Sequence, residues 1–100
     1  MLYAIWTEDL PDALPRRHAA RPAHVEYLKH LQTEGRLILA GPRPRVDAAD
    51  PGEAGFHGSL IVAEFSSLDD ARAWAAQDPY ARANVFGRVE IQPFVKALPA

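Results

Sequence analysis

The sequence predicts an α+β domain of the ferredoxin-like class, with a four-stranded antiparallel sheet and two helices on one face. The chain has 100 residues, which is room for one domain. Four short apolar segments alternate with two helical segments in the order βαββαβ. In one sheet with right-handed crossovers, that order gives the ferredoxin-like arrangement. We therefore expect a single domain over residues 1–100.

The chain opens with a predicted strand and a long helix. Residues 2–7 are aromatic and β-branched and are followed by turn-forming residues, which is typical of a strand. A helical segment covers residues 13–33. Pro22 lies inside it and clashes with the carbonyl four residues earlier, so we expect a kink or a restarted helix there. The well-formed part should be 23–33.

A second strand and a long loop come next. Residues 37–40 form an apolar run, and Gly41 and Pro42 should close it. Residues 43–57 show neither a helical nor an alternating period. A loop of that length is often functional, so it is a candidate lid or rim.

The second half of the chain repeats the order strand, helix, strand. Residues 59–65 form the third predicted strand. Ser67 and Asp70 resemble a capping box at the start of a helix over 68–77. The alternation of residues 88–95 predicts the fourth strand.

Two helices leave one face of this sheet uncovered. The strands expected at its centre, 2–7 and 59–65, are apolar on both faces. Either a second copy of the chain or the loop over 43–57 must cover the second face. Because Val46 and Phe56 are the only large apolar residues of that loop, we favour a homodimer through the open sheet face, a dimeric α+β barrel.

Composition and charge exclude several classes of protein. A net charge of −2 and a pI near 6.0 argue against nucleic acid as a partner. The absence of cysteine excludes thiolate metal sites and cysteine nucleophiles. No segment approaches the ~20 apolar residues of a membrane span, so we expect no membrane partner. The apolar run of residues 1–6 is shorter than the ~7 to 15 residues of a signal-peptide core, which predicts a cytoplasmic protein.

The histidine spacing argues against a metal site. His18, His24 and His30 are six residues apart, which sends neighbours to different faces of one helix. They cannot hold one ion together. We therefore predict neither a metal nor another cofactor.

His24 is the first candidate catalytic residue. It precedes Leu28 by four residues and Leu31 by seven, so it lies on the helix face that should meet the sheet. A histidine satisfied within the core is the alternative interpretation. Arg17 and Arg21 continue the same stripe, however, which is typical of a pocket mouth that attracts an anionic substrate.

Asp78 is the second candidate. It is expected to end the second helix just before Pro79, where an acid opposes the helix dipole, although Asp-Pro is also a common turn. Both helices cover the same sheet face, so Asp78 can approach His24. A carboxylate that holds an imidazole in one tautomer is a recurring way to make a general base.

Two further polar residues keep alternative interpretations. Ser59 suggests a nucleophilic triad with the histidine and the aspartate. The chain lacks a Gly-x-Ser-x-Gly elbow, so hydrogen bonding at the strand start is the simpler role for this serine. Glu64 lies either at the dimer interface or along a cavity.

Several short motifs lie along the chain: residues 21–28, Gly41-Pro42, Gly58-Ser59, Asp78-Pro79-Tyr80 and Pro93-Phe94. In their order and spacing they resemble the YCII-related (YciI-like) family across essentially the whole chain. The resemblance implies a dimeric α+β barrel similar to muconolactone isomerases, with a histidine and aspartate active site at His24 and Asp78. The residues expected to bind substrate are Arg21, Ser59, Gly41 and Tyr80.

We therefore expect a small enzyme without a cofactor that moves a proton on a small, anionic organic molecule, in an isomerisation or an elimination. The alternative is a non-catalytic metabolite-binding or accessory domain with the same pocket. A third class, a pure interaction module, would show no pocket around His24.

Overall fold

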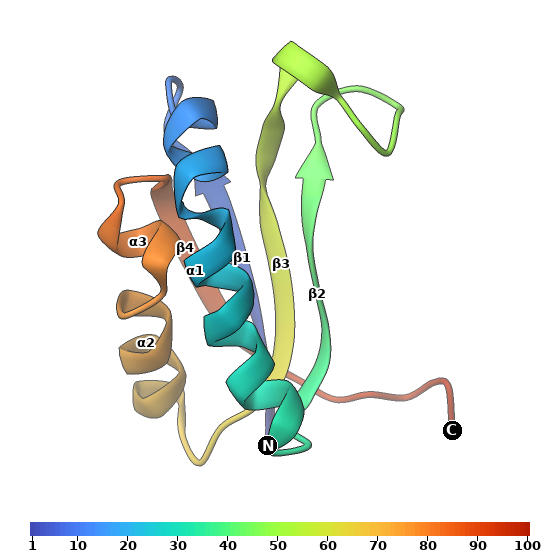
Figure 1. Cartoon of the computed structure of the whole chain (residues 1–100). Helices are drawn as coiled ribbons and strands as arrows, with labels where there is room; N and C mark the ends of the chain where they lie inside the picture. Colours follow the sequence, from blue (N-terminus) through green and yellow to red (C-terminus); the bar gives the residue numbers. More distant parts are fainter.

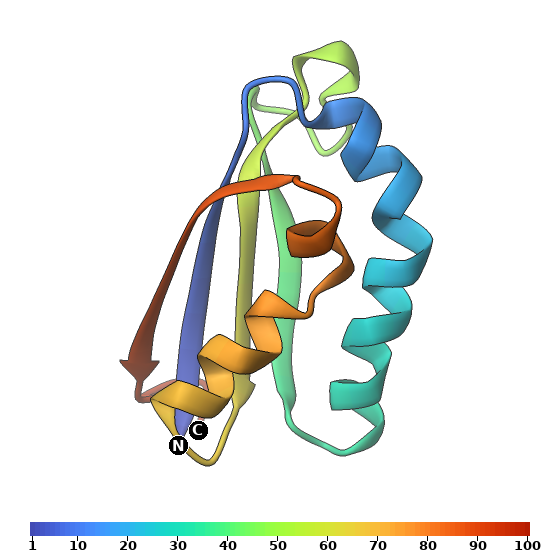
Figure 2. The ribbon, with the colours of Figure 1, turned by 90° about the vertical axis from the view of Figure 1, so that its left-hand side faces the viewer.

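A computed structural model describes residues 1–100 and shows the predicted ferredoxin-like α+β fold. The sheet has the strand order β2-β3-β1-β4, and each adjacent pair is antiparallel. The helices lie together on one face of the sheet (Figures 1 and 2). The elements are β1 (Leu2–Asp9), α1 (Leu14–Thr33), β2 (Leu37–Pro44), the 3₁₀ turn η1 (Gly52–Ala54), β3 (Phe56–Glu64), α2 (Leu68–Ala76), α3 (Pro79–Arg82) and β4 (Phe86–Phe94).

The core lies between the sheet and the helices. Alternate residues of β1 point inward, so that Tyr3, Ile5 and Thr7 are buried. In α1 the buried residues recur every seven positions, at Arg17, His24 and Leu31. The first two are polar, so the helix face that meets the sheet is polar toward the start of α1 and apolar toward its end. The apolar cluster is made of Tyr3, Ile5, Leu31, Ile61, Ala63, Phe65, Ala71 and Ala75.

Helix α1 continues through Pro22 as one element, so the predicted restart is wrong (Figure 2). Proline removes one amide donor from the ladder. Residues on both sides of it are nevertheless anchored, because Arg17 and His24 are both buried against other elements. Tertiary packing therefore outweighs the tendency of proline to interrupt a helix.

Strand β2 does not close at Gly41 and Pro42, as the sequence predicted, but runs on to Pro44. Pro42 pairs with Ser59 of β3, and β2 is an edge strand, where a missing amide donor is tolerated. The connection to β3 is correspondingly shorter than predicted and contains η1. It lies beyond the end of the sheet, beside the start of α1 (Figures 1 and 2).

The second half of the chain differs from the prediction at three places. Strand β3 covers Phe56–Glu64, whereas the prediction was 59–65. Helix α2 ends at Ala76, and a separate short helix, α3, follows it. Strand β4 begins at Phe86, earlier than the predicted start at residue 88. The capping prediction is confirmed, since the Ser67 hydroxyl accepts a hydrogen bond from the Asp70 amide at 3.1 Å.

The outer face of the sheet is covered by no helix and not by the loop between β2 and β3 (Figure 2). Trp6, Leu39 and Phe94 each remain about half exposed there, at 41, 48 and 41%. The guanidinium of Arg43 lies 3.6 Å from the centroid of the Trp6 ring. No helix of the chain is both long enough and apolar enough to cross a bilayer.

Candidate active site

His24 and Asp78 contact each other in the interior, as the sequence predicted. The imidazole Nδ1 lies 2.7 Å from Asp78 Oδ1. Only 8% of the His24 side chain and 1% of the Asp78 side chain are exposed. The pair joins the middle of α1 to the start of α3, which are 54 residues apart in the chain.

Asp78 holds its position because it is the N-cap of α3. Its Oδ1 accepts a hydrogen bond of 2.9 Å from the Tyr80 amide, and Pro79 occupies the first turn. The prediction that Asp78 ends the preceding helix is wrong, because α2 stops at Ala76 and Gln77 caps it. An acid at the start of a helix is electrostatically favourable.

The contact fixes which imidazole nitrogen is free. A carboxylate paired with an imidazole accepts its hydrogen bond, so Nδ1 is the donor toward Asp78 and Nε2 is the nitrogen that Asp78 does not bind. The second carboxylate oxygen, Asp78 Oδ2, is buried without a hydrogen-bond partner. The pair is therefore only half satisfied, which is unusual for buried polar groups.

Tyr80 packs directly on the pair. Its ring is stacked on the imidazole of His24, with centroids 3.7 Å apart and planes at 12°. The residue is only 3% exposed, and burial raises the pKa of its phenol, although nearby Arg17 and Arg21 pull that pKa down. Burial and the charge of Asp78 likewise raise the pKa of Tyr27.

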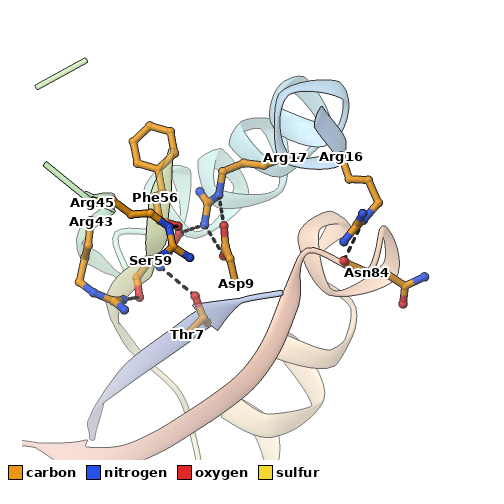
Figure 3. A network of polar contacts seen from close by, with 9 residues as sticks. All are labelled: Thr7, Asp9, Arg16, Arg17, Arg43, Arg45, Phe56, Ser59 and Asn84. Carbon is orange, nitrogen blue, oxygen red and sulfur yellow. Dashed lines mark hydrogen bonds and ion pairs between the residues drawn. The ribbon is translucent and has the colours of Figure 1, made fainter. Parts of the chain in front are cut away.

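A second polar network surrounds Arg17 near the end of β1 (Figure 3). Arg17 lies 4.6 Å from the Tyr80 centroid and makes a bidentate ion pair with Asp9, at 2.7 and 2.9 Å. It also donates to the Ser59 hydroxyl at 3.0 Å. Arg17 is only 3% exposed, so the prediction that it lines a cationic pocket mouth is wrong. Asp9 already neutralises it.

Ser59 is held by its backbone as well as by Arg17. Its amide donates to the Thr7 hydroxyl at 2.9 Å, and its carbonyl accepts from Arg43 at 2.6 Å (Figure 3). The preceding residue must be glycine, because a Cβ at position 58 would lie 1.7 Å from the Thr7 carbonyl oxygen. Ser59 therefore serves here as a hydrogen-bonding residue of the strand.

The other predicted residues lie at different distances from the pair. Arg21 is exposed on α1 and makes no ion pair, but its charge acts on Tyr80. Gly41 pairs with Leu60 on exposed β2 and is not brought to the pair. Glu64 is exposed at the end of β3, 3.5 Å from the amino group of Met1.

Asp9 and Thr7 are part of the network, and the sequence interpretation missed both. Their signal was the alternation of β1, since both continue the inward-facing series of Tyr3 and Ile5. A threonine and an aspartate at inward-facing positions of a central strand need buried partners.

The rest of the surface carries hollows but no metal site. Four hollows of about 340, 470, 580 and 610 Å³ lie elsewhere on the chain, and neither His24 nor Asp78 lines any of them. No group of three His, Asp or Glu side chains is placed to hold a metal ion. None of these hollows is therefore the pocket that the sequence analysis expected around His24, whose side chain is 8% exposed in the single chain.

The fold and the buried histidine-aspartate contact define a small ferredoxin-like α+β domain with a candidate acid-base site. The chain belongs to the YCII-related family, since the model of the YCII-related domain matches residues 1–95. It is 52% identical to Protein YciI of Escherichia coli over 96 residues, covering 96% of this chain and 98% of that protein.

Two further proteins are similar to this chain. The Emericella nidulans protein named derivative of benzaldehyde biosynthesis cluster protein C is 34% identical, with 91% of this chain and 94% of that protein covered. The structure of 5-chloro-2-hydroxyhydroquinone dehydrochlorinase from Burkholderia phenoliruptrix, in complex with 2,5-dihydroxybenzoquinone, superposes with a TM-score of 0.83. It is 24% identical and covers 95% of this chain and 94% of that one, which supports the fold.

Proposed function

We propose that this protein is a small-molecule enzyme of the isomerase or lyase type, in which His24 is the general base and Asp78 orients it. The observation that carries the proposal is the 2.7 Å contact between Nδ1 and a carboxylate that is almost fully buried. Such a carboxylate fixes the imidazole tautomer and stabilises the imidazolium that forms during proton transfer.

In the proposed reaction, Nε2 takes a proton from the substrate, and the electron pair of the broken bond stays on the substrate. An isomerase returns that proton from Nε2 to another atom of the same molecule. In a lyase, the electron pair left on the substrate forms a new double bond, and the leaving group departs with its own bonding pair. Nε2 then gives its proton to solvent. Asp78 remains ionised throughout, next to the cationic ring.

Arg21 is the better of the two nearby arginines for binding an anionic substrate. Arg17 is committed to Asp9 through two hydrogen bonds, whereas Arg21 is exposed and has no ion-pair partner. A free guanidinium one helical turn before His24 favours a carboxylate, an enolate or a phenolate as the charged group. This supports a small, anionic organic substrate.

The similar proteins support the same class of chemistry. A dehydrochlorinase removes the elements of hydrogen chloride, and the solved structure of this fold has a small dihydroxybenzoquinone in complex. The Emericella nidulans relative carries the name of a biosynthesis cluster. Both names are those of proteins concerned with small organic molecules.

The reaction can be tested with 5-chloro-2-hydroxyhydroquinone and a panel of small hydroxyquinones and keto acids. We expect chloride release or solvent deuterium incorporation, followed by NMR, for at least one compound. His24→Ala should abolish it, while His30→Ala, at an exposed histidine of the same helix, should not. Binding without exchange across the panel would favour the metabolite-binding alternative.

We further propose that the reaction needs neither a metal nor another cofactor, because the imidazole itself supplies the base. Dialysis against a chelator should leave turnover unchanged. Restoration of a lost activity by one divalent ion would contradict this. We also place the protein in the cytoplasm, which cell fractionation can test.

Two copies are proposed to pair through the outer face of the sheet. That face carries the half-exposed Trp6, Leu39 and Phe94, and no helix covers it (Figure 2). Light scattering at micromolar concentration should give twice the chain mass. A stable monomer of 11.0 kDa would contradict the pairing.

A further inference from the structure

Tyr80 touches both members of the histidine-aspartate pair through two different parts of the residue. Its amide donates to Asp78 Oδ1 at 2.9 Å, the same oxygen that faces His24 Nδ1. Its ring lies parallel to the imidazole, with the centroids 3.7 Å apart. One residue thus sets the position of the carboxylate and the plane of the base.

The ring of Tyr80 is itself held from several sides. Arg17 lies 4.6 Å from its centroid, and the ring of Phe86 meets it edge-on at 5.9 Å and 83°. The residue is 3% exposed, so little of the phenol surface is available to a ligand. Asp9 and Ser59 fix the guanidinium of Arg17 in turn.

We infer that Tyr80 is a positioning residue for His24, and not the substrate-binding residue that the sequence analysis assigned. The ring stack keeps the imidazole in the plane in which Nδ1 points at Asp78, so that Nε2 is the free nitrogen. The network of Arg17, Asp9 and Ser59 secures that ring. The inference rests on the proposed function for its catalytic meaning, but its geometry can be measured without a substrate.

The test is the tautomer of His24, read by two-bond ¹H–¹⁵N NMR in the whole chain with Tyr80→Phe and Tyr80→Leu. Tyr80→Phe keeps both the stack and the backbone, so Nδ1 should stay the protonated nitrogen. Tyr80→Leu removes the stack, so the ratio of the two tautomers should move by roughly 2- to 10-fold toward the form protonated at Nε2. That is the size of change expected from losing one aromatic pair.

Phe86→Leu is the matched control, because it removes an aromatic contact to Tyr80 without a stacking contact to His24. It should leave the tautomer of His24 near that of the unmodified chain. If Phe86→Leu moves the ratio as far as Tyr80→Leu does, Tyr80 acts only through packing and the inference is overturned.

A measurement on the unmodified chain covers the case in which Tyr80→Leu does not fold. A phenol stacked at 3.7 Å should shift the His24 ring protons upfield of those of the exposed His30 and His57. If the ring protons of His24 have the same chemical shifts as those of His30 and His57, the two rings are not stacked and the inference is overturned.

Kinetics separate this inference from the proposed function once a substrate is in hand. A positioning role lowers kcat in Tyr80→Leu, with partial rescue in Tyr80→Phe. A substrate-binding hydroxyl would instead raise KM in Tyr80→Phe and overturn the inference. If no compound is turned over, the proposed function fails while the tautomer shift still decides the role of Tyr80.

Discussion

Two buried polar pairs tie helix α1 to the rest of the molecule, and they are built differently. Arg17 and His24 are seven residues apart and therefore point to the same side of α1. Each reaches a carboxylate at 2.7 Å, Asp9 in the first case and Asp78 in the second. All four side chains are at most 8% exposed.

The difference lies in how completely each pair is satisfied. Both oxygens of Asp9 accept from Arg17, which also donates to Ser59. In contrast, Asp78 Oδ2 is buried without a partner, and His24 keeps one nitrogen uncommitted. A fully bonded pair secures the fold, whereas a half-bonded pair retains the capacity to bind or exchange a proton.

The largest expected effect on activity is that of His24→Ala. Loss of a general base should lower turnover by roughly 10²- to 10⁴-fold. The chain should keep its fold at reduced stability, because Asp78 stays buried with only the Tyr80 amide bonded to it while the Arg17 pair remains intact. Turnover of an identified substrate, together with circular dichroism, checks this, and undiminished turnover would refute the assignment of the base.

Asp9→Ala should act on stability instead. It leaves the guanidinium of Arg17 buried without its carboxylate, which costs about 3–5 kcal/mol of unfolding free energy. Urea unfolding measures the loss, with the exposed Asp12→Ala as the control. A loss no larger than that of Asp12→Ala would remove the contrast between the two pairs.

Asp78→Asn should lower turnover less than His24→Ala does and lower stability less than Asp9→Ala does. The amide keeps the shape of the carboxylate and can still cap α3 through its oxygen. It neither stabilises the imidazolium nor enforces the tautomer, so turnover should drop by about 10²-fold, the lower end of the range for acid-base groups. The free energy of unfolding in urea should change little. Unchanged turnover together with a large loss of stability would identify Asp78 as purely structural.

The smallest expected effect is a loss of stability at alkaline pH. Burial raises the folded-state pKa of Tyr80 and Tyr27 above the unfolded value of 10.0. The unfolded chain therefore ionises first, so the stabilisation is complete below pH 10 and is lost as the pH rises through the folded pKa. Above pH 10, the free energy of unfolding should fall less steeply with pH in Tyr80→Phe than in the unmodified chain. An equal slope in the two proteins would show that Tyr80 does not cause the loss.

The sequence predicted the fold and the candidate pair, but it did not predict how the pair is held. Apolar alternation and helical spacing depend on local residues, so they located the strands and placed His24 on the inward face. Asp78 was chosen as an unfavourable helix end, yet it caps a helix of four residues that no periodicity can show.

The Arg17 pair was missed for a related reason. A stripe of basic residues has the same pattern whether it is solvated or buried, and only the register of β1 with β3 brings Asp9 and Ser59 to Arg17. Similarly, proline preferences could not show that Pro42 would lie on an edge strand, since strand order is a property of the whole sheet.

Pro22 has a consequence for the dynamics of α1. Because it has no amide hydrogen, the carbonyl of His18 receives no hydrogen bond from position 22, and the ladder is interrupted between Arg17 and His24. The other backbone hydrogen bonds that cross this position can still form, so α1 stays one helix and the gap lies between its two buried anchors. We therefore expect the turn between Arg17 and His24 to be the place where α1 bends most readily.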